Sequence, residues 1–190
     1  MPRRLLPLLA FLVAVLAPSA SAQETRPVED GSTLQYTGRA PLHSWTGRSD
    51  EVSGTLALDL DDPARSSVTL SVPVASFDSG NGTRDRRMRE ATEAERFPEV
   101  TFASRSVTPT TWRGAPGARS GRWIVRGDLS FHGVTRTVEA TVDVREERGR
   151  FVAEPAFEIQ MTEFDVPRPR LGPARTSDTL CFQGRITARL

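Results

Sequence analysis

The feature that most constrains the fold of this chain is an alternation of apolar and polar residues with a period of two. Over residues 123–131, Trp123, Val125, Gly127, Leu129 and Phe131 alternate with Ile124, Arg126, Asp128 and Ser130. The same pattern recurs over 52–60, 67–74, 134–144 and 179–190, and in a shorter form over 157–161. Successive side chains of a strand point to opposite faces, so each segment has one apolar and one polar side. The pattern predicts an antiparallel all-β domain.

Three further segments, 33–36, 45–50 and 100–107, bring the expected number of strands to about eight or nine. Turn residues predict hairpins at "DDPARS" and "REERGR", and Pro/Gly-rich stretches predict longer loops over 108–121 and 166–178. No long amphipathic helix is available to cover the apolar faces, which leaves a sandwich or a closed barrel. We predict a single antiparallel β-barrel of about eight strands, which has room inside for side chains or one slender ligand.

Membrane-spanning barrels also alternate, with the apolar side outward and with aromatic girdles at both interfaces. Here aromatic residues make up 7% of the chain and there is one tyrosine. The composition therefore disfavours a membrane barrel.

The first 22 residues, "MPRRLLPLLAFLVAVLAPSASA", are typical of a secretory signal peptide. Two arginines precede an apolar stretch, and small residues mark a cleavage site near Ala22. An uncleaved anchor is the alternative, but the apolar stretch is shorter than the roughly 20 residues of a membrane span. We expect a signal peptide over 1–22, a flexible lead over 23–32 and a β-barrel domain over 33–190, in a periplasmic or secreted protein.

The charge balance argues against nucleic-acid binding. Without Arg3 and Arg4, 23 basic residues face 24 acidic ones, whereas proteins that bind nucleic acid carry a clear basic excess. The single cysteine, Cys181, cannot form an internal disulfide and is expected to be an ordinary strand residue.

The stretch "GTRDRRMREATEAERFPEVTF" contains five arginines between Arg84 and Arg96. Thr83 is a candidate N-cap, and "TEAE" from Thr92 is a candidate capping box, so the stretch predicts one or two short helices inserted between strands. We expect Met88 and Phe97 to face the barrel and the charged residues to face water. A lid at the barrel mouth is the alternative role. Nearby glutamates offset the arginines, and no aromatic residues are interleaved for base stacking.

Four segments together resemble the YceI-like, polyisoprenoid-binding family of bacteria. They are "LHSWTGRSDEVSGTLALDL", "VPVASFDSGNGTRDRRMREATEAERFPEVTFAS", "GDLSFHGVTRTVEATVDV" and "MTEFDVPRPRLGPARTSDTLCFQGRITARL". The resemblance covers residues from about Thr33 to the C-terminus. It implies a lipocalin-like barrel whose elongated apolar cavity holds an isoprenoid chain, such as a quinone or a polyprenyl phosphate, with no required cofactor.

We expect the following residues to line a ligand cavity, with ordinary core packing as the alternative for each: Trp45, Leu56, Leu58, Leu70, Val72, Met88, Phe102, Trp123, Val125, Leu129, Phe157, Ile159 and Phe182. Candidates for contact with a ligand head group are His43, Arg84, Arg168 and Arg170, chosen for their place on loops. His43 and His132 are the two histidines, and they lack the spacing of a metal site.

These observations favour a binding protein for a long apolar molecule, acting in transport or sequestration, with no catalytic residues, no metal and no nucleic-acid partner. Contact with a membrane or membrane proteins and the oligomeric state are left open. One alternative is a barrel filled by its own side chains that acts through its surface. The other is an enzyme that depends on His43.

Overall fold

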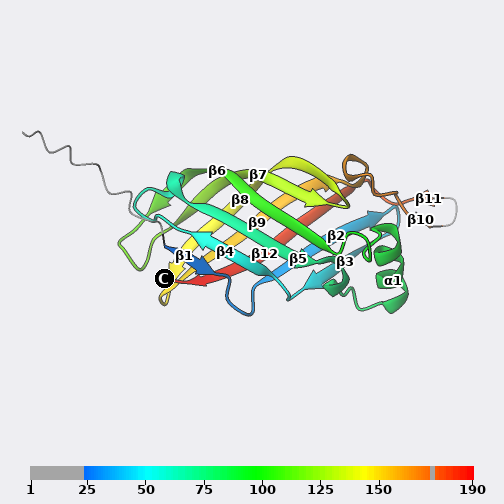
Figure 1. Cartoon of the computed structure of the whole chain (residues 1–190), viewed down its shortest axis with the longest axis horizontal. Coiled ribbons are helices and arrows are strands. Elements are labelled where there is room, and N and C mark those ends of the chain that lie inside the picture. Colours follow the sequence, from blue (N-terminus) through cyan, green and yellow to red (C-terminus); the bar gives the residue numbers. More distant parts are fainter. Residues whose placement is uncertain (1–23, 172–173) are drawn as a thin grey trace, which may run out of the picture.

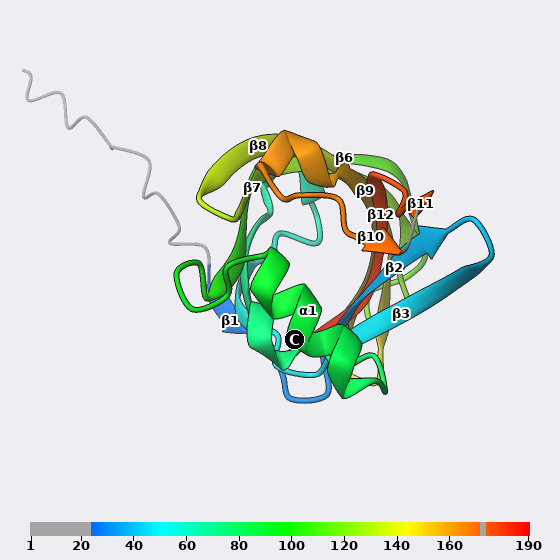
Figure 2. The same cartoon turned by 90° about the vertical axis from the view of Figure 1, so that its right-hand side faces the viewer.

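The computed structural model describes residues 24–171 and 174–190. Most of the chain forms one antiparallel sheet of ten strands in the order β1-β4-β5-β6-β7-β8-β9-β12-β2-β3, which curls into a barrel-like shell (Figures 1 and 2). The strands are β1 (Thr25–Pro27), β2 (Thr33–Ala40), β3 (His43–Ser49), β4 (Ser53–Ala57), β5 (Ser67–Pro73), β6 (Glu99–Arg113), β7 (Ser120–Phe131), β8 (Val134–Glu147), β9 (Arg150–Gln160) and β12 (Thr179–Arg189). The predicted all-β, antiparallel fold class is confirmed.

The remaining elements lie at the ends of the shell. They are the helix α1 (Gly82–Ala91), the 3-10 turns η1 (Pro63–Arg65), η2 (Val74–Ser76) and η3 (Met161–Phe164), and a two-stranded ribbon of β10 (Arg170–Leu171) and β11 (Ala174–Arg175). The helix and the ribbon lie at one end of the shell, and β1 and the C-terminus lie at the other (Figure 1). The signal peptide predicted over 1–22 lies outside the described residues.

Two short bridges hold the edges of the sheet together. At the α1 end, Arg48 of β3 and Asp78, which follows η2, exchange backbone hydrogen bonds of 2.8 and 2.9 Å. At the opposite end, β1 pairs with β4, and the Glu29 N–H donates to the Thr187 carbonyl of β12 at 2.8 Å. The curled sheet is therefore tied across its seam at both ends.

We expected a flexible lead over 23–32, whereas the structure has strand β1 within this segment. Thr25–Pro27 pair with residues of β4, and Ser32 is buried, its hydroxyl donating to Glu29 O and accepting from the Thr187 N–H. Backbone pairing and one buried hydroxyl anchor a segment whose composition is polar.

The prediction of a long loop over 108–121 was also wrong, because β6 extends to Arg113 and β7 begins at Ser120. Proline has no N–H for a sheet ladder and is confined to edges or bulges. Here the ladder shifts register between Pro109 and Thr111. Two threonine hydroxyls replace the missing backbone hydrogen bonds at this point. Thr110 Oγ1 donates to Arg122 O at 2.7 Å, and Thr111 Oγ1 accepts from the Arg122 N–H at 2.9 Å.

The insert is one α-helix followed by turns. Its N-cap is Asn81, whose side chain accepts from the Arg84 N–H at 3.0 Å, and not Thr83 as predicted. The expected capping box does not form, because the Thr92 hydroxyl donates back to Met88 O at 2.8 Å and closes the helix end. Asp85 lies in the first turn, as the helix dipole favours.

Two clusters of apolar side chains line the interior, one toward each end of the shell. The cluster at the α1 end includes Tyr36, Phe77, Phe131, Phe164 and Phe182. The other includes Leu56, Trp123, Val142, Phe151 and Ile186. Phe102 and Phe157 pack against both, so the two clusters share one continuous apolar wall.

Candidate functional site: an elongated apolar cavity

A cavity of about 500 Å³ lies inside the shell. This volume is within the range of roughly 300–1,000 Å³ that is common for ligand sites. Its wall is made by inward-facing side chains of β2–β9 and β12 and by one face of α1. The structure places all thirteen predicted lining residues on this wall: Trp45, Leu56, Leu58, Leu70, Val72, Met88, Phe102, Trp123, Val125, Leu129, Phe157, Ile159 and Phe182. Their contact with a ligand stays a prediction.

Aromatic rings form much of the wall because glycines on neighbouring strands make room for them. Tyr36 lies over Gly47, the residue opposite it in the β2–β3 ladder, so a Cβ at Gly47 would come within 2.4 Å of the Tyr36 ring. The Phe102 ring lies over Gly127 of β7, two residues from Leu129, its partner in the ladder. Farther along the wall, Phe157 and Phe182 stack with ring centroids 5.0 Å apart.

One face of α1 closes over the end of the cavity. Thr83, Arg84, Arg87, Met88 and Ala91, which recur at helical spacing, line it. We refer to this end as the mouth and define it by Asn81, Thr83, Arg84, Arg87 and Thr176. Viewed down the shell, α1 lies on one side of the opening and the β10 segment on another (Figure 2).

The expectation for α1 was correct for Met88 and wrong for two of the arginines. Met88 is half-buried and packs against the core cluster at this end. Arg84 and Arg87, however, line the cavity instead of belonging to a purely solvent-facing side. Two other arginines of the stretch pair with glutamates: Arg86 contacts Glu90 at 2.8 Å and Arg96 contacts Glu93 at 3.3 Å.

Arg84 is held in place by its neighbours. Its Nε donates to Ser79 Oγ at 2.8 Å and its Nη2 donates to Ser79 O at 2.7 Å. The Asp85 carboxylate, which is buried, accepts from the N–H and hydroxyl of the same serine. These bonds leave three guanidinium N–H groups of Arg84 without a partner in the described part of the chain.

Tyr36 lies beneath this cluster and was not among the predicted site residues. Burial raises the pKa of its hydroxyl above the usual value, as does the nearby Asp85 carboxylate, while Arg84 and a hydrogen bond with Trp45 lower it. The hydroxyl is therefore neutral at physiological pH. Its inward orientation follows from the alternation of β2, in which Tyr36 and Gly38 are buried between more exposed neighbours.

The three head-group candidates whose side chains are described do not all lie on the cavity wall. His43 is exposed and lines the cavity, with its ring 5.7 Å from that of Trp45. Arg168 is not among the lining residues and uses Nε and Nη2 to bind Thr176 O, at 3.0 and 2.6 Å. Arg170 belongs to β10, and its side chain lies outside the described part of the structure. Of the three candidates whose side chains are described, His43 and Arg84 lie on the cavity wall and Arg168 does not.

His132 is buried on the outer side of the mouth, at a left-handed backbone position (φ 52°) between β7 and β8. Its Nδ1 lies 3.0 Å from Phe164 O and its Nε2 lies 3.4 Å from Glu93 Oε1. The Phe97 ring packs edge-on against it at 4.9 Å. His132 thus connects the turn after α1 to the sheet and to η3.

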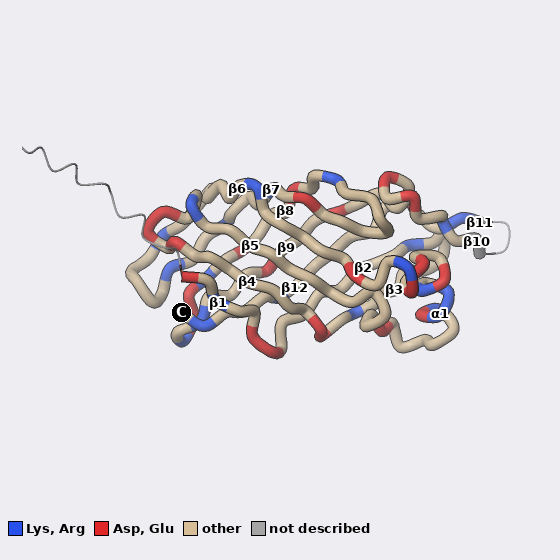
Figure 3. Tube along the Cα trace, viewed as in Figure 1, with Lys and Arg blue, Asp and Glu red and all other residues tan. Residues whose placement is uncertain are grey.

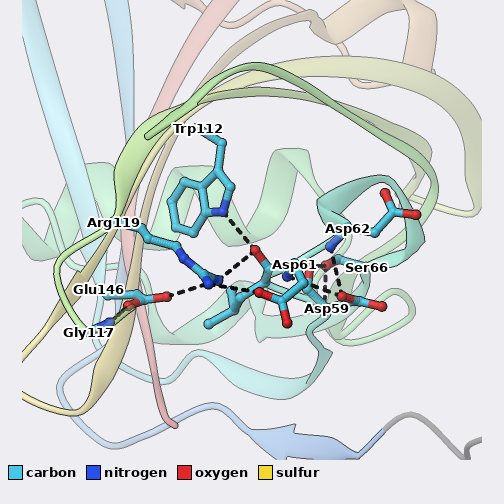
Figure 4. A network of polar contacts seen from close by, with 9 residues as sticks. Asp59, Asp61, Asp62, Ser66, Trp112, Gly117, Arg119 and Glu146 are labelled. Carbon is cyan, nitrogen blue, oxygen red and sulfur yellow. Dashed lines mark hydrogen bonds and ion pairs between the residues drawn. The ribbon is translucent and has the colours of Figure 1, made fainter. Parts of the chain in front are cut away.

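The far end of the shell is cross-linked by a polar network (Figure 4). Trp112 Nε1 and Arg119 Nη1 both donate to Leu60 O at 2.8 Å, and Arg119 Nη2 contacts Asp61 at 2.7 Å. Arg119 also lies 3.7 Å from Glu146, which accepts from the Gly117 N–H and is almost fully buried. These contacts tie the segment around η1 to the β6–β7 hairpin.

Neither metal ligands nor a membrane helix is found in the part of the chain that the structure describes. No three His, Cys, Asp or Glu side chains gather there in a way that could hold a metal ion. No helix within residues 24–171 and 174–190 is long and apolar enough to cross a bilayer.

An antiparallel sheet curled around one elongated apolar cavity defines a lipocalin-like binding fold. The family model for the YceI-like domain matches residues 28–188, and the chain belongs to this family.

Relatives and solved structures agree with this assignment. A UPF0312 protein of Vibrio parahaemolyticus is 30% identical over 131 residues, 64% of each chain, and one of Photorhabdus laumondii is 28% identical over 111 residues, 57% of this chain and 51% of the relative. The matches span less than two thirds of the length of these relatives.

Among solved structures, BcnA of Burkholderia cenocepacia has a TM-score of 0.71 at 20% identity, covering 83% of this chain and 96% of that one. A polyisoprenoid-binding domain from Saccharophagus degradans, implicated in plant cell wall breakdown, has a TM-score of 0.68 at 15% identity, covering 87% and 97%. At these identities the likeness shows the fold.

Proposed function

We propose that this protein binds a long, single-chain apolar molecule of the isoprenoid class inside the shell and carries or sequesters it. The observation that supports this most strongly is the continuous cavity of about 500 Å³. A barrel filled by its own side chains would leave no such volume. Membership of the YceI-like family and the fold shared with a polyisoprenoid-binding domain support the same ligand class.

An apolar chain needs no polar anchor to bind in such a site. Burial of apolar surface contributes about 25 cal/mol per Å². The wall is built from aliphatic and aromatic side chains along its length, and the described residues that line it include no Asp or Glu. Such a wall favours a chain over a polar metabolite.

We also propose that the protein is exported, with cleavage near Ala22, and that it acts by binding and not by catalysis. The proposal of export rests on the charged, apolar and small-residue sections of residues 1–22. The alternative of an enzyme depends on His43, which forms no ion pair with a carboxylate within 4.0 Å among the described residues. Loss of a hydrolytic activity on His43→Ala substitution would favour that alternative.

The proposed binding is tested by blocking the cavity. Val138 of β8 is half-buried and lines the cavity, whereas Thr141 on the same strand is exposed. Calorimetric titration with geranylgeraniol should show binding to the wild type and to Thr141→Trp, and at least a tenfold loss for Val138→Trp. Equal binding by both tryptophan variants, with unchanged circular dichroism, would contradict a ligand inside the shell.

A further inference from the structure

Leu42 is the only large hydrophobic residue that is exposed in the described part of the chain, at 95%. It lies with Pro41 in the two-residue turn between β2 and β3, since Ala40 and His43 are the last pair of that ladder. The hairpin projects to one side of the shell at the α1 end (Figure 2). An exposed leucine alone needs no explanation. The position of this one does, because the cavity wall extends onto the same hairpin.

The cavity wall continues along the hairpin almost to the turn. Tyr36 and Gly38 of β2 and His43 and Trp45 of β3 line the cavity. His43 is exposed and adjoins Leu42 in the chain. The ring of Trp45, which is half-buried, lies 5.7 Å from the His43 ring. These side chains therefore connect the exposed turn with the interior of the shell.

The end of the hairpin contains no acidic residue. Residues 38–47 include one arginine, Arg39, which is exposed, and the ion pair of Arg48 with Asp50 lies at the other end of β3. On α1, at the same end of the shell, arginine and acidic positions occur together (Figure 3), and Arg86 pairs there with Glu90. The turn is thus an apolar point with a cation beside it, and it does not repel an anionic surface.

Turns at the opposite end of the shell have a different composition. The β8–β9 turn consists of Arg148 and Gly149, and the segment around η1 carries Asp59 and Asp61. The β6–β7 turn presents small residues such as Ala115. These turns suit contact with water. The turn with a large apolar side chain lies at the end where α1 closes over the cavity.

From these observations we propose that the β2–β3 turn docks on a lipid bilayer, with Leu42 and Pro41 inserted and the cavity mouth held at the membrane surface. Tryptophan is enriched at the membrane interface, and arginine is attracted to anionic lipid, which suits Trp45 and Arg39. A protein partner fits less well, because stable protein interfaces bury about 800 Å² on each side, far more than a two-residue turn offers. The inference rests on the proposed function, since docking brings the cavity to the source of its ligand.

The edge position of β3 limits the depth of insertion. On its outer side, β3 is paired only through Arg48 with Asp78 among the described residues. Unpaired backbone groups are costly in hydrocarbon, so the strand remains at the level of the lipid head groups and only the turn enters the apolar layer. Burial of one leucine side chain corresponds to about a tenfold gain in affinity or more. The side chain of Leu42 should therefore dominate the binding of the turn.

Cosedimentation with vesicles of phosphatidylcholine and phosphatidylglycerol measures docking. The variants are Leu42→Ser, which removes the apolar side chain without adding charge, and Leu42→Phe, which restores it. Ala115→Ser, at an exposed position of the β6–β7 turn, is the matched control at the opposite end of the shell. We expect Leu42→Ser to lower vesicle binding about tenfold, and Leu42→Phe and Ala115→Ser to bind as the wild type does.

Calorimetry with geranylgeraniol in the absence of vesicles separates docking from ligand binding. Leu42 is not among the residues that line the cavity, so Leu42→Ser should keep the wild-type affinity for this probe. Equal vesicle binding by the wild type and Leu42→Ser, or none by the wild type, would overturn docking and leave the proposed function in place. Vesicle binding that depends on Leu42, in a protein that does not bind geranylgeraniol, would overturn the proposed function alone. Self-association without vesicles that Leu42→Ser abolishes would assign the turn to a second copy and overturn the bilayer as its occupant.

Discussion

The indole of Trp45 lies against Gly38, its partner on the neighbouring strand, so closely that a Cβ at Gly38 would be 2.5 Å from Trp45 Cζ2. The glycine thereby gives one of the largest rings of the cavity wall its position. Gly38→Ala should displace the indole and weaken binding of geranylgeraniol several-fold. Gly82→Ala is the control, since nothing lies within 4 Å of a Cβ there. If both variants bind as the wild type does, the wall does not depend on this contact.

Met88 should be the residue of α1 that joins the helix to the interior. Met88→Asp places a carboxylate against the apolar cluster and should lower the free energy of unfolding by about 2 kcal/mol or more. Arg86→Ala, at an exposed position of the same helix, should change it by less than about 0.5 kcal/mol, as expected of a surface substitution. Urea denaturation of both variants measures this, and equal losses would contradict the orientation of the helix.

The network at the far end should contribute more to stability than a surface ion pair does. Arg119→Ala leaves Glu146, whose side chain is 3% exposed, without its cation, so we expect a loss of about 3 kcal/mol. Arg122→Ala removes a solvent-exposed pair with Asp143 and should leave the urea midpoint almost unchanged. Equal urea midpoints for Arg119→Ala and Arg122→Ala would contradict this, because the buried Glu146 carboxylate would then have found another partner.

Cys181 should react slowly with alkylating agents. Its thiol donates to Glu158 Oε1 at 3.2 Å, and this hydrogen bond, followed by burial, raises the pKa of the thiol above its usual value. Because the thiolate is the nucleophile, Glu158→Gln should speed iodoacetamide labelling at pH 8 several-fold. An unchanged rate would mean that accessibility, and not the carboxylate, limits the reaction.

Glu154 should make a small contribution to folding stability, and this contribution should depend on pH. Its carboxylate bonds to Arg145 and Arg185, and the hydrogen bond from Arg145 is the largest cause of its lowered pKa. A lowered pKa stabilises the fold above the unfolded-state value, near 4.5, and the stabilisation is lost as pH falls through the folded-state pKa. The side chain is 41% exposed, so solvent screening limits the effect. Glu154→Gln should lower the thermal midpoint at pH 7 by a few degrees at most, with no difference near pH 3.

The alternation of residues in the sequence predicted the sheet and the composition of the cavity wall, because burial acts on every second side chain of a strand. The prediction lost accuracy where burial departs from alternation. In β9, Phe151, Val152 and Ala153 are all buried. Val152 pairs with Thr187, which is itself bound by Ser32 of the N-terminal segment, so a distant segment covers this end of the sheet.

Contacts between distant segments also set the polar part of the site. Arg84 lies four residues before Met88 and shares its helix face, so helical spacing alone could have placed it on the cavity wall. The place of Thr176 on the cavity wall depends on the hydrogen bond of its N–H with Pro169 O, which no local pattern records. Pro109 was predicted to lie in a loop because proline lacks an N–H for the ladder. The hydrogen bonds that keep it in β6 come from neighbouring threonine hydroxyls to Arg122 of β7, and such contacts between strands are not visible in the local sequence.

Native mass spectrometry of the protein purified from the exported fraction tests the central claim most directly, when organic extraction and identification of the bound material follow. The account predicts one prenyl lipid per chain, released on denaturation. A protein of unliganded mass, unchanged after incubation with prenyl phosphates, prenyl alcohols and quinones, would contradict the binding function proposed for the cavity.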